Sequence, residues 1–228
     1  MATGQFSTLS CRDLTQKIVA PKDPPTVELS TLHLLPRGSA LLTSSGALAR
    51  NGIQAVIHAA PGAMTRMGAD FDPTVAGLQE SVRNSMELAR RNGFKRVAIP
   101  FIGGGIFRRS LGVDEAQLAD ILVREVLASR GSLEVRLVAV SPRIQMLFEN
   151  ALHENRGEGS DGRVAVVVGS LTEAGVHNAP VIVNAANMEM QFGGGLSGAI
   201  AQATGDGIGI DAEARGLIEC YYANPQKI

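Results

Sequence analysis

The chain has no tryptophan and only two cysteines, and aromatic residues make up 4% of its 228 positions. Cys11 and Cys220 are too few for a disulfide framework and lack the spacing of metal ligands, so we expect neither a metal nor a cofactor. The formal net charge is −1, which gives no reason to expect nucleic-acid binding. No apolar run is long enough to span a bilayer, so no membrane association is expected.

These absences leave an ordinary globular protein with 45% hydrophobic residues and room for one sizeable core. The N-terminal stretch lacks the apolar centre of a cleaved signal peptide. The reducing cytoplasm is therefore the expected location, and secretion without a cleaved signal stays open as an alternative.

Short apolar runs alternate with stretches of helical periodicity, which favours an α/β fold with a largely parallel sheet. Prolines interrupt the beginning of the chain, so residues 1–30 are expected to form an irregular arm before a single domain over residues 31–228. The predicted strands cover residues 39–43, 55–59, 97–102, 135–140, 164–168 and 181–183, and the predicted helices cover residues 75–92, 114–129, 144–153 and 211–222.

The residues best suited to ligand binding are concentrated between residues 181 and 201. A predicted strand ends in the motif Asn-Ala-Ala-Asn at 184–187, and three glycines follow at 193–195, just before another predicted helix. Consecutive glycines let the backbone approach a ligand closely, and amides at a helix start favour an anion such as a diphosphate. A tight turn with packing glycines is the alternative interpretation.

A second triple glycine, at 103–105, follows the predicted strand 97–102 and precedes Ile106 and Phe107. Ligands of open α/β sheets bind in the crevice beyond the strand ends. Two glycine-rich loops there can clasp a diphosphate through backbone amides, without a lysine. Phe107 can pack against a ribose face, and ordinary core packing is its alternative role.

The pattern N-A-A-N, five residues, G-G-G, apolar, small, G-A-I closely resembles the first ligand loop of macrodomains, which are ADP-ribose-binding modules. The stretch Pro100–Phe107 resembles their second phosphate loop. Val56–Pro61 is similar to their V-I-H-A-V-G-P strand, and Asn84–Ala89 to their N-S-L-x-L-A helix. The resemblance covers roughly Arg37 to Tyr222.

The motifs stand in the reverse of the usual order, because an ordinary macrodomain carries the N-A-A-N loop early and the second loop late. Joining Cys220 back to the stretch that begins at Arg37 restores that order, and the polar residues 154–163 then bridge the usual termini. The resemblance therefore implies a three-layer α/β/α macrodomain fold with a mixed sheet, circularly permuted within residues 31–228.

The resemblance implies that the chain binds ADP-ribose, free or attached to a protein, and hydrolyses an ADP-ribosyl bond or a related ester. Asn187 matches the asparagine that orients the distal ribose and is the candidate catalytic residue. Ser170 replaces the aspartate whose carboxylate accepts from adenine in many members, which weakens the expected selectivity for adenine. The candidate substrate-binding residues are Ser170, Leu171, Asn184, Gly193, Gly194, Gly195, Leu196, Ser197, Gly103, Gly104, Gly105, Ile106 and Phe107.

Ser197 stands where hydrolytic macrodomains have an aspartate, and a neutral serine cannot act as a base without a partner. Viral-type macrodomains hydrolyse without that aspartate, with a substrate phosphate to position water. The alternative function is therefore a non-catalytic reader module that binds ADP-ribose on modified proteins or a related nucleotide. His58 is interpreted as a satisfied structural histidine, and Asp206 and Asp211 as a turn residue and a helix N-cap.

Overall fold

A computed structural model describes residues 14–21, 34–62, 72–105, 107–157 and 162–223. A sheet of seven strands, in the order β1-β2-β3-β7-β4-β5-β6, forms its centre. The strands are β1 (Ile18–Val19), β2 (Ala40–Ser44), β3 (Ala55–Ala59), β4 (Arg96–Pro100), β5 (Glu134–Ala139), β6 (Val164–Val168) and β7 (Val181–Ala185).

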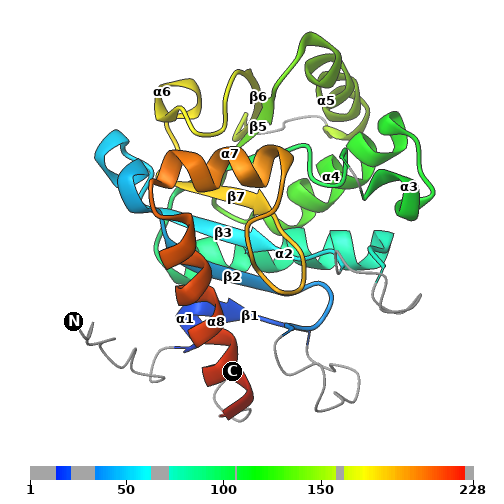
Figure 1. Cartoon of the computed structure of the whole chain (residues 1–228). Coiled ribbons are helices and arrows are strands. Elements are labelled where there is room, and N and C mark those ends of the chain that lie inside the picture. Colours follow the sequence, from blue (N-terminus) through cyan, green and yellow to red (C-terminus); the bar gives the residue numbers. More distant parts are fainter. Residues whose placement is uncertain (1–13, 22–33, 63–71, 106, 158–161, 224–228) are drawn as a thin grey trace, which may run out of the picture.

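The sheet is mixed, and its parallel part defines one functional edge. Strands β3, β7, β4, β5 and β6 run parallel, so their carboxyl ends meet at the same edge. Strand β2 is antiparallel to β3, and β1 is antiparallel to β2. Strand β7 comes last in the chain but lies between β3 and β4, with Val181 paired to Ala55 and to Val97 (Figure 1).

Helices cover both faces of the sheet (Figure 1). Helices α2, α4 and α5 pack on one face, whereas η3, α7, α8 and the short α1 pack on the other. This confirms the predicted three-layer α/β/α arrangement. The helices are α1 (Leu14–Lys17), η3 (Gly46–Asn51), α2 (Val75–Arg91), α3 (Arg108–Leu111), α4 (Glu115–Ser129), α5 (Pro142–Asn155), α6 (Ala174–His177), α7 (Gly195–Thr204) and α8 (Gly207–Ala223).

The strand sequences explain the two layers. Neighbouring side chains of a strand point to opposite faces, so a strand between two helical layers is apolar throughout. In β7, Val181 and Val183 belong to the core beneath α2, and Ile182 belongs to the core beneath α7. All five residues of β3 are buried for the same reason.

The beginning and the end of the chain differ from expectation. Inside the arm predicted for residues 1–30, Leu14–Lys17 forms a helical turn and Ile18–Val19 pairs with β2, while residues 1–13 and 22–30 lie outside the described residues. Cys220 on α8 is disulfide-bonded, unlike the reduced state expected in a cytoplasm. Within the described part of the chain, no helix combines the length and apolarity needed to cross a membrane.

Candidate functional site

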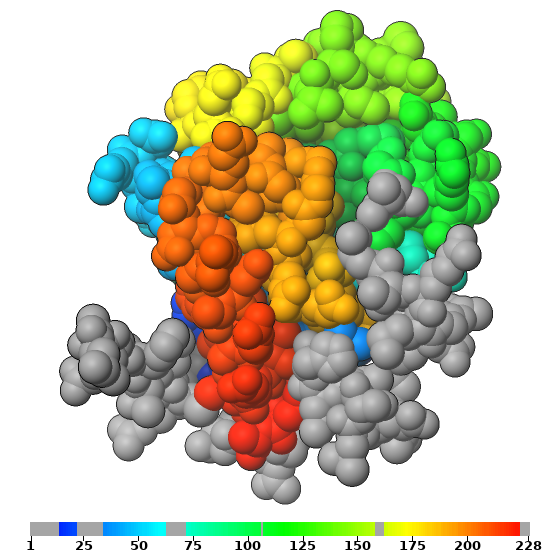
Figure 2. Space-filling model, in the orientation of Figure 1, coloured from blue at the N-terminus to red at the C-terminus, as the bar shows by residue number. Residues whose placement is uncertain are grey.

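The two glycine-rich loops start at neighbouring strand ends. Strands β4 and β7 are parallel partners, with Ala98 opposite Ile182. The loop after β7, residues 186–194, and the loop after β4, residues 101–107, therefore leave the sheet at the same edge. Figure 1 places the β7 loop on the side toward which β3 and β7 point, with α3, which follows the β4 loop, on the same side. Figure 2 shows the β7 loop at the surface beside α7 and α8.

The β7 loop is tied to the body of the protein on three sides. The backbone N–H of Ala186 donates to Ala59 O at 2.9 Å, which extends the pairing with β3. The Phe192 N–H donates to Asp211 Oδ1 on α8 at 2.8 Å. The Gly193 N–H donates to Ser197 Oγ on α7 at 3.2 Å. These bonds hold the loop between β3, α7 and α8.

A buried polar chain lies beneath this loop. Asn184 Nδ2 donates to Ser197 Oγ at 3.2 Å and lies 3.3 Å from His58 Nδ1. Because an amide nitrogen only donates, His58 Nδ1 is the acceptor and the ring proton is on Nε2. His58 Nε2 lies 2.9 Å from Thr43 Oγ1, which accepts that proton, so both ring nitrogens have partners.

Burial lowers the pKa of His58 to about 3, because a charged imidazole would lose its hydration in the core. His58 is fully buried, and its ring packs against Phe192 of the loop, with the ring centroids 5.2 Å apart. The neutral ring thus supports the loop and cannot serve as a base near pH 7. The interpretation of His58 as a satisfied structural histidine is confirmed.

The Ser197 oxygen already accepts two hydrogen bonds and is not placed to act as a base. This Oγ accepts from both Asn184 Nδ2 and Gly193 N, and these two donors occupy its lone pairs. The side chain is 7% exposed, and no described carboxylate or histidine nitrogen accepts its proton. This oxygen cannot take a proton from water without breaking the bonds that position the loop.

Asn187, the residue matched to the distal ribose, has an unused acceptor. Its side chain is 6% exposed, and its Oδ1 is buried without a hydrogen-bond partner. The Oδ1 of Asn184 is likewise buried and unpartnered. An unpartnered buried acceptor carries a desolvation cost, so both oxygens are free to accept from a donor outside the chain.

The glycines of the β7 loop serve different purposes. Gly195 has φ +61°, a conformation that side chains rarely adopt, and a Cβ on Gly198 would stand 2.9 Å from Gly193 O. Gly194 is exposed, has φ −86°, and a Cβ there would meet no atom within 4 Å. Gly194 is the N-cap residue of α7, where glycine is favoured over larger apolar residues, but neither packing nor a positive φ excludes a side chain there. Leu196, beside these glycines in α7, is half-buried against the core.

The β4 loop is supported by apolar packing. Gly103 has φ +85°, and a Cβ on Gly104 would stand 2.2 Å from the Phe101 ring. Gly105 is exposed and open, with no atom within 4 Å of a Cβ position. Phe107 is half-buried and precedes α3, and Ile106 lies outside the described residues.

Ser170 and Leu171 lie at the same edge but farther along the sheet, because β5 separates β6 from β4. Ser170 Oγ lies 2.9 Å from Thr172 Oγ1 and accepts from the Thr172 N–H, as in a local turn. Leu171 is 1% exposed, and its carbonyl accepts from His177 Nε2. The Leu171 side chain belongs to the core, which leaves its backbone N–H for any ligand contact.

Asp211 is a site residue that sequence reasoning missed. The sequence predicts it as a helix N-cap, but α8 begins at Gly207, where Asp206 accepts from the Gly209 N–H, and that prediction is wrong for Asp211. Burial raises the pKa of Asp211, while its bond from Phe192 and the charge of Arg215 act in the opposite direction. No local signal links Asp211 to Phe192, because the contact depends on how α8 packs.

Two other features lie outside the site. A cavity of about 510 Å³ sits between α5 and β6, lined in part by His153, Arg156 and Val166, away from the glycine loops. Among the described residues, no group of three or more histidine, cysteine, aspartate or glutamate side chains is placed to hold a metal ion.

The fold and the site together define a three-layer α/β/α protein with two glycine-rich loops at one sheet edge. Residues 24–116 match the family model of the Macro domain. The chain is also similar to an O-acetyl-ADP-ribose deacetylase from Cronobacter turicensis, with 38% identity over 89 residues, which are 39% of this chain and 45% of that protein. Over residues 24–116, the chain is therefore similar to the Macro domain family.

The sequence matches are partial. The chain spans less than half the length of the deacetylase. The family match includes β2, β3, α2 and β4 but ends before β7. No solved structure shows significant similarity.

Proposed function

We propose that this protein binds ADP-ribose, free or attached to a protein, in the crevice between its β7 and β4 loops. Gly194 and Gly105 carry this proposal. Each loop contains one exposed glycine that neither the backbone conformation nor packing requires. Two such glycines on loops at the same sheet edge leave room for a ligand to approach both backbones closely, and a diphosphate lying on backbone amides is such a ligand.

The unpartnered acceptor of Asn187 supports the placement of the distal ribose. A ribose hydroxyl donates to an amide oxygen, and this oxygen is buried with nothing else to accept from. The adenine end would lie toward β6, at Ser170 and the backbone of Leu171. There the neutral Ser170 hydroxyl, already bonded to Thr172, offers adenine a weaker contact than a carboxylate does.

We also propose that the family's late half comes first in this chain, as in a circular permutation. The central position of the late strand β7 supports this, as does the family match that ends at residue 116. The hydroxyl of Tyr222 near the end of α8 donates to Leu34 O, so the two places that a recut would join are in contact. The connection from α5 to β6 would then bridge the usual termini.

The proposed activity is hydrolysis of an ester or ADP-ribosyl bond at the distal ribose. The deacetylase named above acts on such an ester, which supports this substrate class. Asn187 would orient the ribose, and the Ser197 hydroxyl and the loop amides would donate to developing negative charge. Since neither Ser197 nor His58 can take the proton, a phosphate of the substrate would position the attacking water.

The second candidate is a non-catalytic reader of ADP-ribosylated proteins. Its support is the same pair of residues: a serine whose oxygen accepts two hydrogen bonds and a histidine whose pKa lies at about 3. Binding needs only the amides and Asn187, so it survives without a base.

Calorimetry with ADP-ribose tests the shared premise. We expect binding in the micromolar range, and no heat at millimolar ligand would contradict both candidates. Turnover of O-acetyl-ADP-ribose and of a mono-ADP-ribosylated protein then separates them. A rate that Asn187→Ala abolishes supports the hydrolase, whereas binding without turnover supports the reader.

A further inference from the structure

Arg37 carries a buried guanidinium edge that has no partner. Its Nε and Nη2 atoms are buried and make no hydrogen bond. None of the ion pairs between described residues involves Arg37. Burying charged N–H groups without an acceptor costs free energy, so this arrangement calls for an acceptor from outside the chain.

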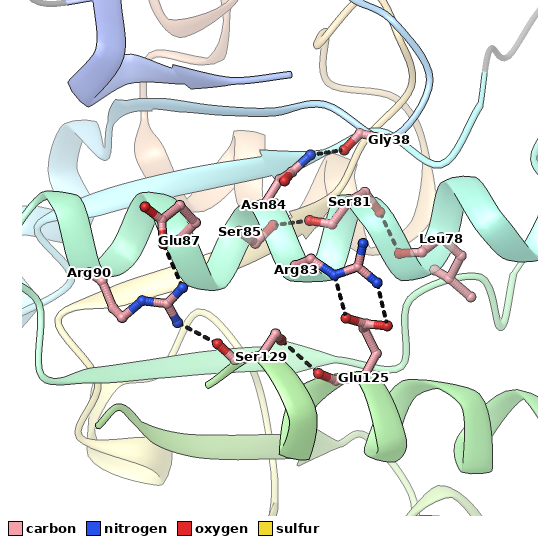
Figure 3. A network of polar contacts seen from close by, with 10 residues as sticks. All are labelled: Gly38, Leu78, Ser81, Arg83, Asn84, Ser85, Glu87, Arg90, Glu125 and Ser129. Carbon is pink, nitrogen blue, oxygen red and sulfur yellow. Dashed lines mark hydrogen bonds and ion pairs between the residues drawn. The ribbon is translucent and has the colours of Figure 1, made fainter. Parts of the chain in front are cut away.

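The backbone around Arg37 is fixed. The Gly38 N–H donates to Ala60 O at 2.8 Å, and Asn84 Nδ2 on α2 donates to Gly38 O at 2.8 Å. Figure 3 shows Asn84 reaching Gly38 from α2. The residue therefore starts from a rigid position between the end of β3 and α2.

The side chain of Arg37 packs against the first turn of α2, where Gly77 leaves space for it. A Cβ on Gly77 would stand 2.6 Å from Arg37 Cγ and 2.6 Å from Pro61 O, so only glycine leaves room for the stem. The first turn of α2 has no acidic residue. The Glu80 carboxylate approaches Gly38 but forms no ion pair with Arg37, so the Nε and Nη2 atoms of Arg37 keep no acceptor.

Another arginine of this protein shows which acceptor suits a guanidinium edge. Arg83 uses its Nε and Nη2 to donate to the two carboxylate oxygens of Glu125, each at 3.1 Å (Figure 3). In such a side-on pair, the two N–H groups of the guanidinium match the two oxygens of a carboxylate in spacing and direction. Arg37 presents the same two atoms without the carboxylate.

Arg37 lies near the Asn187 end of the site. Met188, the next residue after Asn187, donates from its N–H to Gly62 O at 3.1 Å and accepts from the Leu35 N–H at 2.8 Å. The segment before β2 is thus bonded to the β7 loop on the side away from β4. A ligand whose diphosphate lies between the two loops would extend beyond its distal ribose toward Arg37.

We propose that Arg37 forms a subsite for a carboxylate of a peptide that carries ADP-ribose, on the peptide side of the distal ribose. This inference rests on the proposed binding function and adds a substrate class to it: acidic sequences around the modified residue. The diphosphate is held by the loops, so the guanidinium is left for the peptide.

The test uses two peptides that carry ADP-ribose on the same serine and differ only in having glutamate or glutamine beside it. The wild-type chain should bind the glutamate peptide about tenfold more tightly, the scale of one charge-assisted pair. Arg37→Met keeps the stem over Gly77 and should remove this preference, while its affinity for ADP-ribose alone stays within about twofold. Arg37→Lys keeps the charge without the paired donors and should retain only part of it.

The matched control is Arg50→Met on η3, an exposed arginine at the other end of β2, which should keep the full preference. The melting temperature of ligand-free Arg37→Met should not fall below that of the wild type, because no internal bond is lost. Equal binding of the two peptides by the wild type, or a preference that survives in Arg37→Met, overturns the subsite. Failure of ADP-ribose alone to bind is a different result, since it overturns the proposed function and the subsite with it.

Discussion

The two triple-glycine loops differ in what holds them. The loop after β7 is tied by polar bonds to Ser197 and Asp211 and rests on the neutral ring of His58. The loop after β4 is held by apolar contacts, with Gly104 against the Phe101 ring and that ring edge-on to Phe148 at 5.4 Å. The same tripeptide thus has a titratable support in one loop and an inert support in the other.

The glycines of the two loops also differ in whether the fold itself excludes a side chain at their positions. Gly103 and Gly195 have positive φ, and Gly104 lies too close to a ring for any side chain. Gly194 and Gly105 have no such reason, one in each loop. Although the two loops are held differently, each contains an exposed glycine with empty space beside it. This shared feature supports a common ligand for the two loops.

The largest expected effect comes from adding side chains at these two open glycines. Gly194→Val and Gly105→Val should each lower ADP-ribose affinity by about 100-fold, or about 2.7 kcal/mol, because a branched side chain would cover the amides. The free energy of unfolding should change by less than about 0.5 kcal/mol in Gly105→Val, where the space is empty, and should fall by about 1 kcal/mol in Gly194→Val, because valine is a poor N-cap for α7. Calorimetry and urea unfolding measure the two quantities.

Gly157→Val is the matched control, because Gly157 is exposed and open but lies in the connection to β6, at the opposite edge of the sheet. It should leave affinity unchanged. If the site variants lose stability instead of affinity, the glycines have a structural purpose and the argument from open space fails.

The second prediction concerns the apolar support of the β4 loop. Phe101→Ala should lower the free energy of unfolding by about 2–3 kcal/mol, because it removes a half-buried ring that packs on Phe148 and Gly104. Phe101→Leu, which keeps most of the apolar volume, should cost less than about 1.5 kcal/mol. Both losses should be the same at pH 7 and pH 5, and a clear pH dependence would break the contrast between the loops.

The strands, the main helices and the positions of both loops were predictable from sequence, because short β-branched runs and helical periodicity are local signals. The neighbouring placement of the two loops was expected from the family resemblance, and the parallel pairing of β4 with β7 explains it. The hydrogen bond from Phe192 to Asp211 spans 19 residues and depends on the packing of α8, so no local sequence pattern predicts it. The buried, unpartnered guanidinium edge of Arg37 could not be predicted either, because it depends on the room left by Gly77.

The third prediction concerns the titratable support of the β7 loop. His58 has a pKa of about 3 in the folded protein and an ordinary value of 6.5 when unfolded. Below pH 6.5, His58 therefore binds a proton in the unfolded chain but not in the folded one. The free energy of unfolding decreases as the pH falls for this reason. Between pH 7 and pH 5 this loss is about 2 kcal/mol.

Urea unfolding at several pH values measures this loss, and His58→Gln should remove it. Burial also lowers the pKa of His177, so part of the acid sensitivity should remain in the variant. His177→Gln alone, away from the glycine loops, separates the two contributions. An unchanged pH profile in His58→Gln would show that the support beneath this loop does not titrate as described.

The smallest expected effect is at Asp211, where charge and hydrogen bonding can be separated. Burial raises the pKa of Asp211 above its unfolded value, so the folded chain holds the proton more readily, and ionisation at higher pH costs stability. Asp211→Asn keeps an oxygen that accepts from Phe192 and removes the buried charge. Its stability at pH 7 should therefore stay within about 1 kcal/mol of the wild type, with a flatter profile in mild acid. Asp211→Ala also removes the acceptor and should weaken ADP-ribose binding by about threefold, since the loop loses its hydrogen bond to α8. If Asp211→Asn weakens binding as much as Asp211→Ala does, the negative charge of Asp211 holds the loop, and a neutral hydrogen bond does not.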